Sequence, residues 1–547
     1  MPVVQTLHSH HIFLFPFKWK SEKSIEALRP LIEKSWTRQT SFSLSTVAEF
    51  NEYNYFHDFV RPILYDLDNS PLKHIEHDDT FLDHYAHPIL GDGETDYCIK
   101  TKDKTYKLKI DRLGVLLHIY SLGVGVLSFH LSNHEDSQAS EEDILAINQY
   151  GRRTYPPFFA LPKEAIGTTA AFIYNNFEEG LRLSQEKELA QSIWFEKAKT
   201  PLGGYAEDFS RYKDATYFKE DPFLIPLFIE KLFPERFFSI KTEGAKPVFD
   251  DRMFVLCWYG NDSFAKKLSE NREYLKDGWW YRFVFVDGST KTCQNDEMIE
   301  EQLKKSVNPR WSGYRTFYGA SRYSFVCLTD TLKTLKTNDA EFIVHHFQTI
   351  YYKMVELVLL QRACLLHFSD KVTDISSKLG GDETTLNQDV NVLYQEYIRF
   401  VNKIYFREIT AQEQGIELYN LLQTQMGIAE NVAALDNEIK ELHDYVSLKE
   451  DRKRNELDNE RNKLESQRND RIEWLTKITT AFGIAGLIMA FFGMNYFGKE
   501  TFVFWNTGGG IDFSVITTVV GIGFIVSVVS YFTYNKIINH MINKFKK

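Results

Sequence analysis

WLTKITTAFGIAGLIMAFFGM (474–494) and FSVITTVVGIGFIVSVVSYFTY (513–534) are two apolar stretches near the C-terminal end of a chain of 547 residues. Each has about the 20 residues that an α-helix needs to cross a bilayer. Lys477 is the one charged residue in them, and its long stem can reach the interface from the first turns. We predict two transmembrane helices, joined by an outer loop at 495–512.

Lysine and arginine are distributed unevenly around these stretches. The outer loop holds one cation, Lys499. Cations flank both outer ends, at Arg452, Lys453, Arg454, Arg461, Lys463, Arg468 and Arg471 before the first stretch and at Lys536, Lys544, Lys546 and Lys547 after the second. Because cytoplasmic segments carry the excess of positive charge, we expect both termini in the cytoplasm, with 535–547 as a basic tail.

The composition of the remaining chain is that of a soluble body. A net charge of −11 argues against a nucleic-acid-binding protein, so no nucleic acid is expected as a partner. The five cysteines are scattered and form no CxxC motif, as in reduced cytosolic proteins. The apolar run at 12–17 is too short for a secretory signal.

A short motif ends the first membrane stretch. Gly493-Met494-Asn495 follows Phe491 and Phe492 where the helix would meet the outer interface. From about Asn469 to Lys547 this arrangement resembles the CorA superfamily of divalent-cation channels. The resemblance implies a homopentamer in a bacterial inner membrane, so further copies of the chain and the lipid bilayer are its implied partners.

The resemblance also implies roles for residues of the pore. Gly493, Met494 and Asn495 would form the selectivity filter, where a ring of neutral amide oxygens binds hydrated Mg²⁺ without trapping it. Mg²⁺ or another divalent cation would be the permeant or regulatory ion, and no covalently bound cofactor is expected. The pore-lining positions implied are Ile472, Leu475, Gly483 and Gly486.

Two features depart from the family pattern. Family members usually carry a polar residue where Gly486 stands and a bulky apolar one where Gly483 stands. Gly483-x-x-Gly486 is equally typical of a helix-packing motif. The Met-Pro-Glu stretch that commonly follows Gly-Met-Asn is replaced by Tyr-Phe-Gly-Lys-Glu at 496–500. These departures leave ordinary Mg²⁺ selectivity open.

A helical region and stalk are predicted at 336–473. Proline is absent from Ile416 to Met494, so a continuous helix there would exceed roughly 100 Å. The apolar stretch Ile350–Phe368 contains charges that are costly in a membrane, so we interpret it as a buried soluble helix. A heptad seam of packed helices is indicated by Leu421, Ile428, Val432, Leu435, Ile439, Leu442 and Val446.

The first 335 residues are predicted to form a cytosolic α/β domain that senses a ligand. Alternating apolar residues at 106–110 indicate a half-buried strand, and Ser140 followed by two glutamates indicates a helix through Tyr150. Further strands are predicted at 115–119, 124–131, 254–258, 283–286 and 323–328. From Asp339 onward the chain should be helical.

Arginines beside aromatic residues are the candidates for a nucleotide site. Paired guanidinium groups bind phosphate, and aromatic faces stack on a base. Two solvated arginines in a turn would be the plainer explanation. The candidate nucleotide-binding residues are Arg152 and Arg153 with Tyr150 and Tyr155, and a second group of Arg310, Arg315 and Arg322.

Other chemistry is weakly indicated. The sequence contains no P-loop, dinucleotide motif or nucleophile elbow, so we expect no enzyme and no catalytic residues. His8, His10 and His11 could bind a metal, but such clusters are more often incidental, and no metal site is predicted.

Three functions follow as hypotheses. The large body and the stretch at 11–17 look similar to CorA-like proteins associated with type III CRISPR systems. This similarity implies a gated antiviral effector, opened by a small nucleotide messenger that conjugates S-adenosylmethionine to AMP. The alternative is a housekeeping Mg²⁺ or Co²⁺ channel regulated by intracellular Mg²⁺. A membrane-tethered enzyme is disfavoured by the lack of a catalytic motif.

Overall fold

The computed structural model describes residues 6–19, 24–39, 44–65, 81–91, 93–155, 189–210, 225–234, 237, 245–249, 251–331, 339–380, 383–496 and 513–545. It gives the backbone alone for 339–341, 383, 491–496, 513–519, 530, 537 and 540–545. The chain divides into two compact units, Met1–His443 and Asp444–Lys547.

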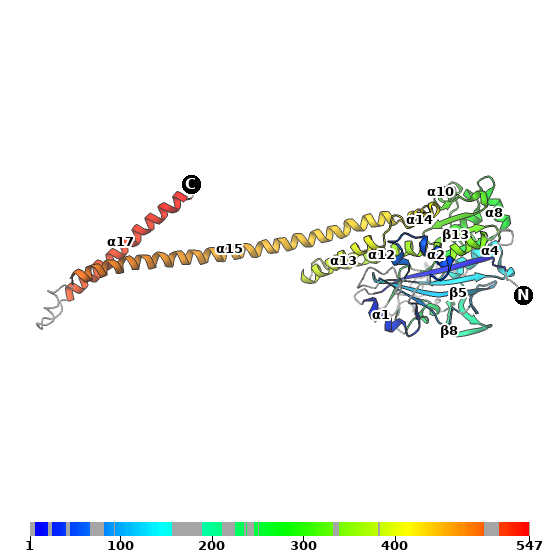
Figure 1. Ribbon diagram of the computed structural model, residues 1–547, viewed down its shortest axis with the longest axis horizontal. Coiled ribbons are helices and arrows are strands. Elements are labelled where there is room, and N and C mark those ends of the chain that lie inside the picture. Colours follow the sequence, from blue (N-terminus) through cyan, green and yellow to red (C-terminus); the bar gives the residue numbers. More distant parts are fainter. Residues whose placement is uncertain are drawn as a thin grey trace, which may run out of the picture. The chain divides into compact units, whose positions relative to one another are not determined.

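One mixed sheet organises the first unit (Figure 1). Its central order is β11-β12-β13-β10-β1-β6-β5-β4-β7-β8, and the pairs are antiparallel except β10 with β13, which run parallel. The thirteen strands of the described chain are β1 (Ser9–Lys18), β2 (Thr37–Gln39), β3 (Leu82–Ala86), β4 (Thr95–Lys100), β5 (Thr105–Tyr120), β6 (Val124–Asn133), β7 (Ser192–Lys197), β8 (Thr200–Asp208), β9 (Lys246–Pro247), β10 (Phe254–Gly260), β11 (Val307–Asn308), β12 (Phe317–Ser321) and β13 (Ser324–Thr329).

Helices cover this sheet and continue toward the C-terminus (Figure 1). Their bounds are α1 (Ile25–Ile32), α2 (Val47–Asn54), α3 (Arg61–Leu64), α4 (Glu141–Gly151), α7 (Leu227–Glu230), α8 (Asp262–Ser269), α9 (Gly278–Phe285), α10 (Asp296–Ser306), α11 (Asp339–His346), the π-helical η7 (Phe347–Tyr351), α12 (Tyr352–Ser377), α13 (Glu383–Lys403), α14 (Glu413–Met426), α15 (Ile428–Tyr496) and α17 (Phe513–Phe545). Short 3₁₀ turns are η1 (Asp136–Gln138), η5 (Glu273–Leu275) and η6 (Ser312–Tyr314).

The two faces of the sheet differ in chemistry. Successive side chains of a strand point to opposite faces. On β1, Phe13, Phe15 and Phe17 enter the aromatic core on the side of α4, and burying each contributes about 1.5–3 kcal/mol. His10 lies on the other face, under η7 and α12, where Gln348 approaches it. The α/β class predicted for this region is therefore correct.

Most predicted elements of the body are confirmed. The alternation at 106–110 and the run at 115–119 form one long strand, β5, which a bulge interrupts between Ile110 and Val115. Helix α4 begins with a capping box between Ser140 and Asp143, which satisfies backbone donors of the first turn. Strands β6, β10 and β13 occupy the other predicted stretches.

The strand predicted at 283–286 is wrong. These residues end helix α9, and Val286 is its left-handed C-cap. The Asp277 side chain accepts a hydrogen bond from the Trp280 backbone at 2.8 Å and so starts the helix. Aromatic and β-branched residues favour strands in general, but this cap and burial of the helix determine the local structure.

After Asp339, the predicted buried helix is confirmed, whereas the helix predicted to run continuously from Ile416 to Met494 is interrupted. The predicted soluble helix at Ile350–Phe368 begins in the last residues of η7 and continues in α12, whose residues Leu357–Leu360 are fully buried. Gly427 adopts φ +64 and ends α14, so the long helix α15 starts at Ile428, after the predicted Ile416. At about 1.5 Å per residue, its 69 residues still span roughly 100 Å.

The heptad seam is largely buried: Leu421 and Val432 are half-buried, and Val446, which belongs to the second unit, is buried. Leu435, Ile439 and Leu442 are 8 % exposed or less. Helix α13 lies against this part of α15: the hydroxyl of Tyr397 donates to the backbone oxygen of Val432 at 3.3 Å. The seam therefore packs α15 against its own chain.

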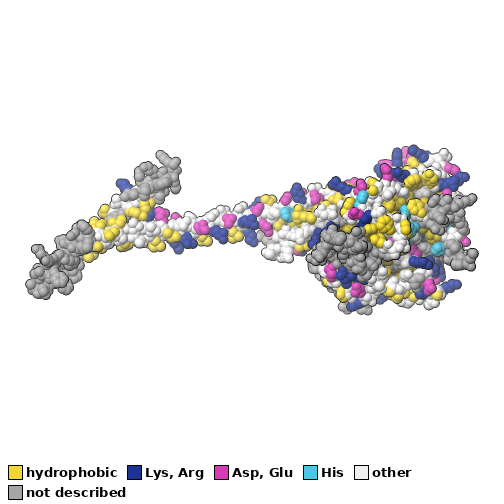
Figure 2. Space-filling view, viewed as in Figure 1, with side chains coloured by type: hydrophobic (Ala, Val, Ile, Leu, Met, Phe, Trp, Pro, Cys, Tyr) yellow, Lys and Arg dark blue, Asp and Glu magenta, His cyan; other side chains and the backbone are white. Residues whose placement is uncertain are grey.

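The second unit exposes an unusually apolar surface. Among the described residues, one helix, α15, is long and apolar enough to cross a membrane by length and composition. Hydrophobic side chains gather over the end of α15 and over α17, whereas charges line the preceding turns (Figure 2). A side chain at Gly523 of α17 would meet Met489 of α15 at 2.9 Å, so these two helices are in close contact.

Candidate anion-binding site

The predicted pair Arg152 and Arg153 lies at the C-terminal end of α4. Arg152 caps that helix, and each arginine is 3 % exposed. The interpretation of two solvated arginines in a turn is therefore wrong. Burying a guanidinium costs several kcal/mol unless partners compensate, so the partners decide what these residues can do.

Arg152 is incompletely satisfied. Its Nη2 donates to Gln149 Oε1 at 3.1 Å and to the Val286 carbonyl at 2.9 Å. Its Nε and Nη1 are buried and have no hydrogen-bond partner within the described part of the chain. Burial, followed by repulsion from Arg153 and Arg252, holds the pKa of Arg152 well below its usual value. An anion at this place would relieve both penalties.

Asp251 is shared by two neighbouring arginines. It forms a buried ion pair with Arg153 and accepts from Arg252 Nε at 2.6 Å. Backbone contacts fix this arrangement, since Met253 N donates to the Arg152 carbonyl at 2.7 Å and Arg153 forms an isolated bridge with Arg252. The end of α4 is thereby held against the chain that enters β10.

Aromatic rings extend the cluster. The guanidinium carbons of Arg252 and Arg362 each lie 4.9 Å from the ring centre of Tyr323, and Arg362 lies 4.5 Å from that of Phe249. Burial lowers the pKa of Arg362 as well. No carboxylate bonds Arg152 or Arg362 in the region that the structure describes.

The parallel pairing of β10 and β13 brings these groups together. Val255 pairs with Ser324, so Arg252 and Tyr323 precede neighbouring strands at the same sheet edge. The nucleotide-site residues predicted from the sequence did not include Arg252, Tyr323 or Arg362. An available signal was an arginine one or two residues before each of two apolar strands, at Arg252 and Arg322.

The four guanidinium groups of Arg152, Arg153, Arg252 and Arg362, with Tyr323 and Phe249, are called the arginine cluster below. Its excess positive charge suits phosphate oxygens, and its rings suit a planar base. Tyr150 and Tyr155 are partly buried and pack on the hydrophobic core.

The second predicted group is dispersed. Arg310 pairs with Glu417, and Arg315 lies 3.5 Å from Asp330. Arg322 is exposed, and its carbonyl accepts from Arg362 Nη1 at 2.6 Å. Only Arg322 thus reaches the arginine cluster, through its backbone.

The N-terminal histidines are separated. His8 bonds Asp136 at 2.8 Å, and His11 bonds Asn148 of α4 at 2.8 Å. His10 faces the opposite side of β1. These three residues do not converge on one ion.

The predicted pore residues all lie in α15. The side chains of Ile472 and Leu475 are about half exposed, and a side chain added at Gly483 or Gly486 would meet no described atom within 4 Å. The side chains of Gly493-Met494-Asn495 fall outside the described residues.

Comparison with known proteins identifies no relative: no family model, no curated protein and no solved structure matches the chain.

Proposed function

We propose that this chain is the subunit of a CorA-like, homopentameric cation channel in a bacterial inner membrane. In this proposal both helices of the second unit, 474–494 and 513–534, cross the bilayer, with both termini cytoplasmic. Ile472, Leu475, Gly483 and Gly486 line the pore, and Gly493-Met494-Asn495 forms its filter.

The apolar surface supports a membrane location. Phe482, Leu487, Phe524 and Phe532 are each about 70 % exposed or more in the single chain. Contiguous apolar surface of this kind requires a lipid or protein partner. Small residues allow close contact between the helices, since Ala481 and Ala485 are the buried residues of this part of α15.

We further propose that the channel is opened by a small nucleotide messenger, a conjugate of S-adenosylmethionine and AMP, in type III CRISPR antiviral defence. The observation that carries this proposal is the arginine cluster, where Arg152 is buried and Arg362 is half-buried, and no carboxylate among the described residues is bonded to either. A nucleotide offers the phosphate and the ring that this cluster matches.

A second candidate is a housekeeping Mg²⁺ or Co²⁺ channel. The net charge of −11 favours it, because acidic side chains can bind regulatory Mg²⁺. In that case the arginine cluster has a structural role only.

Cation flux from proteoliposomes separates the candidates. The full-length protein is compared with Arg252→Gln/Arg362→Gln, which removes two charges that contact Tyr323. The matched control is Arg310→Gln, an exposed arginine paired with Glu417. We expect the conjugate to open wild type and the control, and the double variant to lose most of this response while assembling normally.

Flux without nucleotide, suppressed by internal Mg²⁺ and equal in all three proteins, would support the housekeeping channel instead. Asn495→Ala tests the filter independently, because both candidates require that its ion selectivity change. Unchanged ion selectivity in Asn495→Ala would contradict the proposal that Gly493-Met494-Asn495 forms the selectivity filter.

A further inference from the structure

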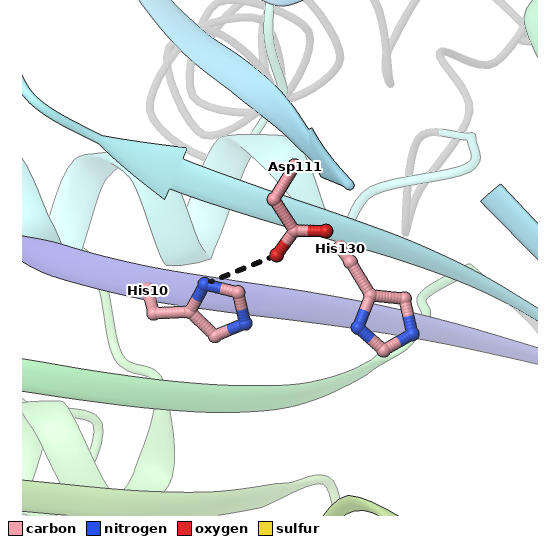
Figure 3. Close-up of side chains that lie close together, drawn as sticks. All are labelled: His10, Asp111 and His130. Atoms are coloured by element: carbon pink, nitrogen blue, oxygen red, sulfur yellow. Dashed lines mark ion pairs between the residues drawn. The ribbon is translucent and has the colours of Figure 1, made fainter. Parts of the chain in front are cut away.

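Three ligand-type side chains converge on the α12 face of the sheet. His10 of β1, Asp111 of β5 and His130 of β6 each offer one ligand atom within 4.8 Å of the other two. Figure 3 shows the two imidazole rings facing each other with the carboxylate beside them. His10 Nδ1 lies 3.7 Å from Asp111 Oδ2.

Strand register and a β-bulge bring these three residues together. His10 pairs with Ser132, so His130 is its diagonal neighbour on the same face. Strand β5 bulges after Ile110, opposite His130, and a bulge turns a side chain toward its neighbours. Gly114, at φ +74, allows this turn, and a side chain there would meet Gly91 at 2.8 Å.

Each residue is oriented by one atom and leaves another unsatisfied. Asp111 Oδ1 accepts from the backbone of Leu113 at 2.8 Å, and His130 Nε2 contacts Ser128 Oγ at 3.2 Å. In the described part of the chain, His10 Nε2, His130 Nδ1 and Asp111 Oδ2 are buried without a hydrogen-bond partner. Metal ligands are commonly held by such outer bonds while the remaining atom faces the ion.

The electrostatics agree with this arrangement. His10 and His130 are fully buried, and burial favours the neutral imidazole, which is the form that binds a metal ion. The Asp111 carboxylate is half-buried beside the two rings. A cation would compensate this carboxylate. No lysine or arginine bonds Asp111 in the region that the structure describes.

We propose that His10, Asp111 and His130 bind a divalent transition-metal ion of the zinc class. Two imidazoles and one carboxylate favour Zn²⁺, Fe²⁺ or Mn²⁺ over Mg²⁺ and Ca²⁺, which prefer oxygen ligands. Bonds of about 2.1 Å need the ligands closer than 4.8 Å, so the ion draws the side chains inward. This site is separate from the arginine cluster and does not depend on the proposed channel function.

Metal content is measured on the full-length protein, produced with added Zn²⁺ and purified without chelator. We expect about one equivalent of zinc per chain, and at least a tenfold loss in Asp111→Asn and in His130→Gln. His11→Gln is the matched control, because this neighbouring buried histidine bonds Asn148 on the opposite face. The same protein incubated with Mg²⁺ or Ca²⁺ should retain neither.

Wild type without metal, or variants that keep the full equivalent, would overturn the proposal. If a variant fails to fold, Co²⁺-substituted wild type decides. Visible d–d absorption of bound Co²⁺ that disappears when zinc is added supports ligation by these residues. The absence of this absorption would overturn the proposal. Zinc should also raise the midpoint of thermal unfolding by about 2 °C or more in wild type and in His11→Gln only.

Discussion

At the scale of single residues, burial of the Arg152 guanidinium costs stability, whereas the proposed nucleotide site needs its charge. This guanidinium is buried, with Nη2 making two hydrogen bonds and with Nε and Nη1 lacking a partner in the described part of the chain. An apolar side chain of similar volume removes an uncompensated charge, which is often neutral or stabilising. A buried charge with unsatisfied nitrogens is expected to serve a ligand.

We therefore expect Arg152→Met to leave the free energy of unfolding unchanged or to raise it by about 1 kcal/mol. Binding of the nucleotide conjugate should weaken at least tenfold. Chemical denaturation and titration calorimetry measure the two quantities. Arg153→Met is the contrasting variant: Asp251 loses its buried partner, keeps only the pair with the more exposed Arg252, and the protein should be destabilised by up to about 3 kcal/mol. A strongly destabilised Arg152→Met would argue for a purely structural role.

His87 gives a pH dependence of known sign. It is 4 % exposed, packs edge-on against Trp36 at 5.1 Å, and accepts from the Ile89 backbone at 3.4 Å. Burial lowers its pKa to about 4, from an unfolded value of 6.5. Between these values the unfolded chain binds more protons, so stability falls as pH falls from about 6.5 to about 4.

The loss attributable to His87 is at most about 3 kcal/mol. We expect His87→Gln to unfold with a shallower pH dependence than wild type over this interval, as followed by urea denaturation at several pH values. The half-buried His346, whose pKa is also lowered by burial, contributes in the same direction in both proteins. Equal slopes would mean that His87 is already protonated in the folded protein.

At the scale of elements, alternation and capping predicted much of the body. The residues at 106–110 alternate because one face of β5 is buried, and Ser140 starts α4 through its capping box. The run at 283–286 carries the same apolar signal in a helix. Local composition does not distinguish the two, and the cap at Asp277 decides.

The candidate site was half predictable for a related reason. Arg152 and Arg153 are adjacent in sequence, so their pairing is visible there. Arg252, Tyr323 and Arg362 join them through the parallel contact of β10 with β13 and through the packing of α12, which are long-range. The metal-type cluster likewise depends on a bulge in β5 that leaves no periodic signal.

Gly427 separates α14 from α15, and its left-handed conformation disfavours other residues. An added side chain would lie 3.3 Å from Asn431 and Glu430. We expect Gly427→Ala to lower the free energy of unfolding by about 1 kcal/mol, measured by denaturation in detergent. Gly313→Ala is the control, since an added side chain would meet no described atom within 4 Å and Gly313 has no positive φ. Equal changes in the free energy of unfolding for the two variants would mean that the backbone between α14 and α15 accommodates a side chain without strain.

For the whole molecule, the turns of α15 between the buried seam and the apolar end need an explanation. From 451 to 471 every side chain is exposed, including Leu457 at 58 % and Leu464 at 66 %. A helix that is polar all round is stabilised by its own ion pairs or by partners. The two leucines are seven residues apart and therefore share one face, which favours association with the same helix of other chains.

The proposed homopentamer predicts the size of the particle. Five chains of 64.0 kDa each give about 320 kDa, to be measured by mass photometry or light scattering with the detergent contribution removed. Leu457→Lys/Leu464→Lys places like charges on the shared face and should yield smaller particles, because each contact then desolvates lysines. Ser466→Lys adds an exposed charge on these turns and should leave the assembly intact. A wild-type particle of 64.0 kDa would be a single chain and would contradict the proposed pentamer.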